Sequence, residues 1–195
     1  MFRFIVHDTR LVGYAPAGAE IEAIKVDAGT LLSSFIQKAM NASERKGKEI
    51  SIEIMSHGED TGGDLICCKE HIKLSTVNQF LPLQGGVKGG IVIYSCRAAM
   101  IAKGKANQDG DGNMLCSRLA QVVRTTVKAS TALQEYSFSR GKSGGCNKGP
   151  IVSPIEWGEW EGTVLTYGPE GNVIDVENHP AGTGMDHQEI EVDWA

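Results

Sequence analysis

Two residues combine a chemically reactive side chain with a position at the end of an apolar segment. Cys96 follows Gly89-Gly-Ile-Val-Ile-Tyr-Ser, and His57 follows Ser51-Ile-Glu-Ile-Met-Ser and precedes Gly58. A thiol becomes an effective nucleophile when a neighbouring imidazole takes its proton. Each residue alone has an ordinary explanation, because cysteine packs as a small apolar group and histidine serves in structural hydrogen bonds. Together they predict nucleophilic chemistry at one site.

The segments before these two residues are typical of buried strands. Both are rich in strand-favouring residues and reach the reactive side chain almost without polar interruption. The carboxyl ends of parallel strands meet at one edge of a sheet, where open α/β sheets bind ligands. We therefore expect His57 and Cys96 at neighbouring strand ends.

The periodicity of the rest of the chain predicts the α/β class. Strands are expected at residues 2–8, 21–26 and 49–56, with a helix over 30–45 before the third. A helical crossover between strands favours a parallel sheet. A weaker helix at 72–83, a helix capped by Asn113 and a strand at 125–128 follow.

The order strand-His-Gly and then strand-Cys resembles the caspase-like (clan CD) cysteine peptidases. These include caspases, clostripain, gingipains, self-cleaving toxin proteases and bacterial CHAT-type domains, and the last two bacterial groups are the most similar. The likeness covers roughly residues 49–131, including Tyr94-Ser-Cys96-Arg-Ala-Ala and Val127-Lys-Ala129-Ser130-Thr131. It implies a three-layer α/β fold with a mainly parallel sheet of about five strands flanked by helices.

The resemblance also implies a function. Cys96 would attack a peptide carbonyl, and His57 would polarise the site or protonate the leaving amine. It further implies a peptide or protein substrate, control by self-cleavage or by an activating protein partner, and no required metal or organic cofactor. In this family, the segment that corresponds to Ala129, Ser130 and Thr131 lines the pocket for the residue before the scissile bond. Packing explains these small side chains equally well.

The segment after His57 could shape the reaction site. Because Gly58 has no Cβ, its amide can approach a reacting carbonyl, so the amides of Gly58 and Cys96 are candidate oxyanion donors. A glycine needed only for a turn is the alternative. Asp60 and Asp64, with Glu59, lie on an expected rim hairpin and could favour a basic substrate side chain. Surface solvation explains these carboxylates equally well.

Residues 102–113 form a polar, glycine-rich connection. Asp109, Asp111 and Asn113 alternate like the start of a calcium loop, but Ala120 stands where an EF-hand has its bidentate Glu. A flexible loop is therefore favoured over a calcium site. A second basic, glycine-rich loop is expected at residues 138–148.

The last third of the chain predicts a β extension. Short strands are expected at 151–156, 162–167 and 172–176, with Trp157 and Trp160 for packing or for a groove wall. We interpret residues 1–176 as one caspase-like domain with a C-terminal hairpin at about 151–176. Residues 177–195 are acidic and are expected to be a loose tail.

Composition limits the surroundings of the protein. The 195 residues carry a net charge of −5, which argues against nucleic acid or an anionic membrane as a partner. No apolar run approaches the roughly 20 residues that span a bilayer, and no export signal is recognisable. An odd number of cysteines without metal-type spacing suits a reducing compartment. We expect a cytoplasmic protein.

Two alternatives remain to the peptidase interpretation. A catalytically silent caspase-like module for protein interaction could retain Cys96 and His57 by descent. An unrelated α/β domain could instead bury Cys96 in its core, because one scaffold hosts many functions.

Overall fold

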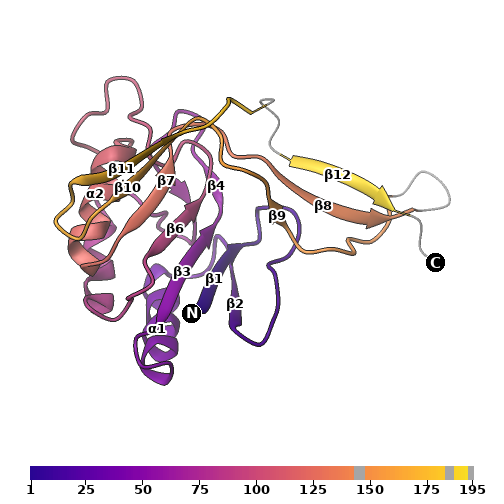
Figure 1. The fold of residues 1–195 in the computed structure, drawn as a ribbon, viewed down its shortest axis with the longest axis horizontal. Coiled ribbons are helices and arrows are strands. Elements are labelled where there is room, and N and C mark those ends of the chain that lie inside the picture. Colours follow the sequence, from indigo (N-terminus) through magenta and orange to yellow (C-terminus); the bar gives the residue numbers. More distant parts are fainter. Residues whose placement is uncertain (143–147, 183–186, 193–195) are drawn as a thin grey trace.

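The computed structural model describes residues 1–142, 148–182 and 187–192. Its centre is a seven-stranded sheet in the order β11-β10-β7-β6-β3-β1-β2 (Figure 1). The parallel strands are β1 (Phe2–Asp8), β2 (Ile21–Val26), β3 (Ile50–Met55), β6 (Ile91–Tyr94) and β7 (Val127–Ser130). The antiparallel hairpin of β10 (Thr163–Tyr167) and β11 (Val173–Asn178) extends the sheet beyond β7. The α/β class and the mostly parallel sheet are confirmed.

Within the described residues, two α-helices and one 3-10 helix accompany the sheet. They are α1 (Leu32–Arg45), α2 (Gly112–Val123) and η1 (Val77–Leu83). The N-cap of α2 is Asp111 rather than the expected Asn113, because the Asp111 carboxylate accepts from the amide of Met114 at 2.9 Å. No helix within the described residues is long and apolar enough to cross a membrane.

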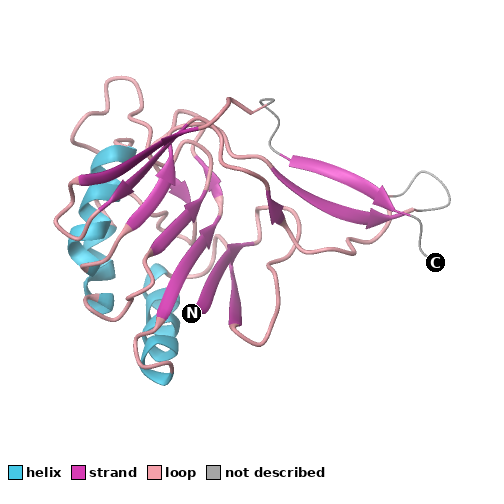
Figure 2. Cartoon of the chain, in the orientation of Figure 1, coloured by secondary structure: helices cyan, strands magenta, loops and turns pink. Residues whose placement is uncertain are grey.

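The helices share one face of the sheet, as Figure 2 also shows for α1 and α2. Alternate strand residues such as Phe4, Ile52 and Ile93 are buried in the same core as Phe35 of α1 and Leu119 of α2. The expected third layer of helices is therefore not found among the described residues. A smaller cluster packs instead near the opposite face, formed by Ile5, Leu11, Met55, Tyr136, Phe138 and Ile155.

A second sheet projects from the first. It contains β8 (Tyr136–Gly141), β9 (Glu156–Trp157) and β12 (His187–Val192), and Figure 1 shows β8 and β12 extending away from the main sheet. The expectation of a loose tail over 177–195 is wrong where β11 and β12 lie, since β12 pairs in parallel with β8. The expected loop at 138–148 begins inside β8, and residues 143–147, 183–186 and 193–195 lie outside the described residues.

Three aromatic rings stack on the helix-free face. Tyr94 lies between Trp157 and Trp160, with ring centroids 5.1 and 5.3 Å apart and interplanar angles of 14° and 13°. Tyr94 belongs to β6, whose neighbouring residue Ile93 points into the helix-covered core. Both tryptophans therefore pack onto the strand that leads to Cys96.

Candidate active site

The register of β3 and β6 brings the two predicted residues to the same level. Met55 is paired with Tyr94, and the amide of Ser56 donates to the Tyr94 oxygen at 3.2 Å. His57 and Cys96 each follow two residues after a member of the Met55–Tyr94 pair. Both line one pocket of about 260 Å³, together with Gly58, Glu59, Asp60, Arg97 and Leu133. The expectation that they meet at neighbouring strand ends is consistent with this geometry.

Gly58 is packed against the main chain of Cys96. A Cβ on Gly58 would lie 1.9 Å from the Cys96 oxygen, so no other residue fits without displacing that main chain. The expected rim hairpin is present, because β4 (His57–Gly58) pairs antiparallel with β5 (Leu65–Ile66). The close approach explains the glycine, while the oxyanion role of the Gly58 and Cys96 amides stays a prediction.

The orientation of His57 depends on a main-chain contact. Its Nε2 lies 3.2 Å from the main-chain oxygen of Arg10. A carbonyl oxygen can only accept, so Nε2 carries the hydrogen in this contact. In the neutral ring Nδ1 is then the nitrogen that can accept a proton.

An ion pair between the buried Asp8 and the half-buried Arg10 holds the residue that supplies this oxygen. Asp8 is fully buried, and its carboxylate accepts from Nε of Arg10 at 2.7 Å, from Nη2 at 2.6 Å and from the Cys68 amide at 3.0 Å. The hydrogen bond to Asp8 raises the pKa of the Arg10 guanidinium. Position at the end of β1 was the only sequence signal for Asp8, and it did not distinguish burial from solvation.

Cys96 differs in its surroundings from the other described cysteines. It is partly exposed, whereas Cys67, Cys68 and Cys116 are buried, and burial raises the pKa of Cys116 to about 12. The Cys96 sulfur accepts from the amide of Gln134 at 3.5 Å and donates to the Gln134 oxygen at 3.6 Å. Cys146 lies outside the described residues.

The turn after Cys96 is conformationally unusual. Arg97 has a φ of 55°, in the left-handed region that residues with side chains rarely adopt. Its amide donates to the Ala132 oxygen at 2.7 Å, and its oxygen accepts from the Gly63 amide at 3.1 Å. These contacts hold the chain in a turn immediately after the sulfur. Such strained residues cluster at functional sites.

The three small residues predicted to line a substrate pocket do not line the pocket of His57 and Cys96. Ala129 and Ser130 are fully buried, and the Ser130 hydroxyl donates to the Glu161 oxygen at 2.6 Å. Thr131 is half-buried and donates to the Thr163 oxygen at 3.1 Å. From this part of the chain it is Leu133 that lines the pocket. The small residues thus serve packing and main-chain bonding in this structure.

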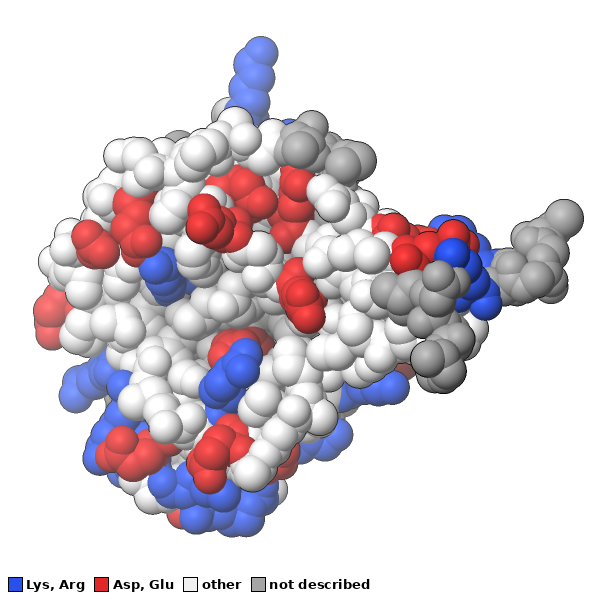
Figure 3. Space-filling view, turned by 45° about the vertical axis from the view of Figure 1, so that its right-hand side comes forward, with Lys and Arg blue, Asp and Glu red and all other residues white. Residues whose placement is uncertain are grey.

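The mouth of the pocket carries both signs of charge. Glu59 and Asp60 line it, but the Asp64 carboxylate instead accepts from the Gly110 amide at 2.9 Å, and burial raises its pKa. Arg97 also lines the pocket and donates to the main-chain oxygen of Asp60. Figure 3 likewise shows basic side chains among acidic ones on one face of the molecule. Of the three carboxylates expected at the mouth, Glu59 and Asp60 therefore line the pocket beside Arg97, whereas Asp64 is not among its lining residues.

The candidate calcium ligands are engaged by other groups. Asp109 accepts from Ser75 and pairs with Lys73, and the Asp111 carboxylate accepts from the amides of Met114 and Asn107. The Asn113 amide oxygen accepts from the Tyr167 hydroxyl at 2.9 Å. Among the residues described, no group of three or more His, Cys, Asp or Glu residues could hold a metal ion.

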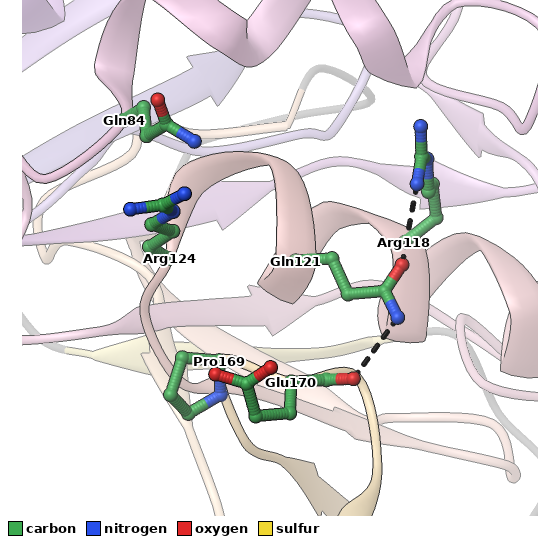
Figure 4. A pocket seen from close by; sticks show the side chains of 6 residues that line it. All are labelled: Gln84, Arg118, Gln121, Arg124, Pro169 and Glu170. Carbon is green, nitrogen blue, oxygen red and sulfur yellow. Dashed lines mark hydrogen bonds between the residues drawn. The ribbon is translucent and has the colours of Figure 1, made fainter.

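A larger cavity lies at the opposite edge of the sheet. It measures about 610 Å³ and lies beside the β10–β11 turn and the end of α2 (Figure 4). Its lining residues carry guanidinium, amide and carboxylate groups but no thiol, hydroxyl or imidazole: Gln84, Arg118, Gln121, Arg124, Pro169 and Glu170. The thiol of Cys96 and the imidazole of His57 therefore lie at the smaller pocket and not at this cavity.

Comparison with protein-family models, with curated proteins and with solved structures finds no match for this chain. The expected relationship to caspase-like peptidases is therefore carried by the order of the motifs around His57 and Cys96. Any functional conclusion depends on the residues of the pocket itself.

Proposed function

We propose that the chain is a caspase-like cysteine peptidase that hydrolyses peptide bonds in the pocket at the ends of β3 and β6. The observation that carries this proposal is that two adjacent parallel strands deliver His57 and Cys96 to one pocket at the same level. The partial exposure of Cys96 argues against the alternative in which this cysteine is part of the core.

The reaction uses the thiol and the imidazole in two steps. The Cys96 proton passes to Nδ1 of His57, and the sulfur forms a bond to the peptide carbonyl carbon. The carbon–nitrogen bond then breaks as Nδ1 returns the proton to the leaving amine. Water hydrolyses the resulting thioester, which releases the acid and restores the thiol. Nε2 keeps its hydrogen on the Arg10 oxygen throughout.

Charge that develops on the carbonyl oxygen needs donors within about 3 Å. The amides of Gly58 and Cys96 are proposed for this role, because Gly58 lies in close contact with the Cys96 main chain. The residues that carry these steps are all protein groups, so the mechanism requires no metal or organic cofactor.

Single and double substitutions test the proposal. Cys96→Ala should abolish turnover of a fluorogenic peptide library, and His57→Ala should lower it by about 10²- to 10⁴-fold. The double variant should be no worse than Cys96→Ala, because the two residues act as one unit. Cys116→Ala and His179→Ala serve as controls for the loss of a thiol or an imidazole elsewhere.

The result that would overturn the proposal is the absence of Cys96-dependent turnover in the parent protein. This outcome would favour a catalytically silent interaction module. Retention of most activity by His57→Ala would exclude His57 as the proton carrier.

A further inference from the structure

Gln134 contacts the candidate nucleophile through its main chain. Its amide donates to the Cys96 sulfur at 3.5 Å, and its oxygen accepts from the thiol at 3.6 Å. The adjacent main chain is also tied to the segment after Cys96. The Ala132 oxygen accepts from the Arg97 amide at 2.7 Å, and the Ser130 oxygen accepts from the Ala99 amide at 2.9 Å.

The side chain of Gln134 anchors this arrangement to a distant segment. Gln134 is 3 % exposed, and its Nε2 donates to the oxygens of Leu133 and Glu161 at 2.7 and 3.0 Å. Its Oε1 accepts from the Glu161 amide at 3.4 Å. The amide group therefore satisfies both polar main-chain atoms of Glu161, which lies just before β10.

Deprotonation of Cys96 selects between the two main-chain contacts. A thiolate can accept a hydrogen bond but cannot donate one. The contact with the Gln134 oxygen is therefore available only to the thiol, whereas the contact with the Gln134 amide persists in the thiolate. A hydrogen bond to the charged form of a group favours that form.

From this geometry we infer that Gln134 is a positioning residue. Its side chain binds the main chain of Glu161, and this clamp fixes the main-chain amide of Gln134 where it can donate to the Cys96 thiolate. This inference rests on the proposed function of the same site. Because the clamp binds Glu161, a displacement of the segment between Trp160 and β10 should also displace the Gln134 amide from the Cys96 sulfur. Nothing in the local sequence around Gln134 signals this role, because the contacts are made by its main chain and by a residue 27 positions away.

The test uses Gln134→Met, which preserves side-chain volume and removes the clamp. Alkylation of Cys96 by iodoacetamide is followed by peptide mapping across a range of pH, with Cys116 as an internal reference for a buried thiol. The midpoint of the Cys96 profile should rise, and labelling at neutral pH should slow by about three- to tenfold, since one pKa unit corresponds to tenfold. In a peptidase assay kcat should fall with KM little changed.

Ser43→Ala is the matched control. It removes another buried hydrogen bond from side chain to main chain, to the Gly86 oxygen, remote from the pocket. It should leave the Cys96 midpoint unchanged. If Gln134→Met does not fold, Gln134→Asn replaces it, because the shorter stem keeps an amide but draws it back from Glu161.

The outcomes separate the two proposals. An unchanged Cys96 midpoint in the folded Gln134 variant overturns the role of Gln134, even if the peptidase is active. A shifted midpoint in a protein without peptidase activity supports the positioning role and overturns the proposed function instead.

Discussion

Nε2 of His57 lies 3.2 Å from the main-chain oxygen of Arg10, so the candidate base is oriented by a residue that is itself fixed by Asp8. Asp8 is fully buried, and its carboxylate also accepts from the Arg10 amide at 3.1 Å, so the contacts continue along the Arg10 main chain to the imidazole. The contact with the Arg10 oxygen assigns the tautomer of His57.

Asp8→Asn should therefore affect both folding and turnover. The substitution removes the charge opposite Arg10, and the free energy of unfolding should fall by about 1 to 3 kcal/mol. We expect kcat to fall by about tenfold, because His57 remains present but is less firmly oriented. Glu22→Gln, which breaks the more exposed pair with Arg45, is the control in urea unfolding and in the kinetic assay. Equal behaviour of the two variants would refute the orienting role.

Gly58→Ala should disrupt the pocket. The added methyl group would lie 1.9 Å from the Cys96 oxygen, so the main chain must move. We expect a lower thermal midpoint and loss of most activity. Gly158→Ala is the matched control, because a Cβ there meets no atom within 4 Å. If the Gly58→Ala protein were fully active, the close packing of Gly58 against Cys96 would not be required for activity.

Substrate preference should follow the carboxylates that line the mouth. Glu59→Gln and Asp60→Asn should each reduce a preference for Lys or Arg before the scissile bond by less than about tenfold, because exposed charges are screened. Asp64→Asn should leave the preference unchanged, since that carboxylate is bonded to Gly110. A peptide library varied at one position measures all three. A parent preference for acidic residues would mean that Arg97 dominates the mouth.

Stability should depend on pH through His7. Burial lowers the pKa of this imidazole below 6.5, outweighing its hydrogen bond to Leu11 and the nearby charge of Asp8. Below pH 6.5 the unfolded chain then binds more protons than the folded one, so the free energy of unfolding falls with falling pH. Urea midpoints at pH 7.5 and 5.5 should differ less in His7→Gln than in the parent. An identical difference would exclude His7 as the source.

Much of the fold could be predicted from local patterns. Continuous apolar strands before His57 and Cys96, and the apolar face of α1, identified the parallel sheet and its crossovers. The single helical face was not predicted, although Ser51 and Glu53 alternate along β3 with isoleucines of the helix-covered core. Strand β12 was missed because its pairing depends on the edge offered by β8 rather than on its own sequence.

The site was only partly predictable for a different reason. The roles expected of His57 and Cys96 follow from their side chains, and that of Gly58 from its lack of one. These properties can be read directly from the sequence. Arg10 and Gln134 act through main-chain atoms, which every residue possesses. The small residues Ala129 and Ser130 could equally mark a pocket or tight packing, and only their burial distinguishes the two.

The stacked rings of Trp157, Tyr94 and Trp160 give the protein a built-in optical signal. Indole emission depends on the neighbouring ring and on access of water, and Tyr94 lies two residues before Cys96. Fluorescence from these two tryptophans should therefore report whether the segment before β10 remains packed against Tyr94 of β6. A change in emission on addition of a peptide would reveal movement at β6, the strand that precedes Cys96, before any bond is cleaved.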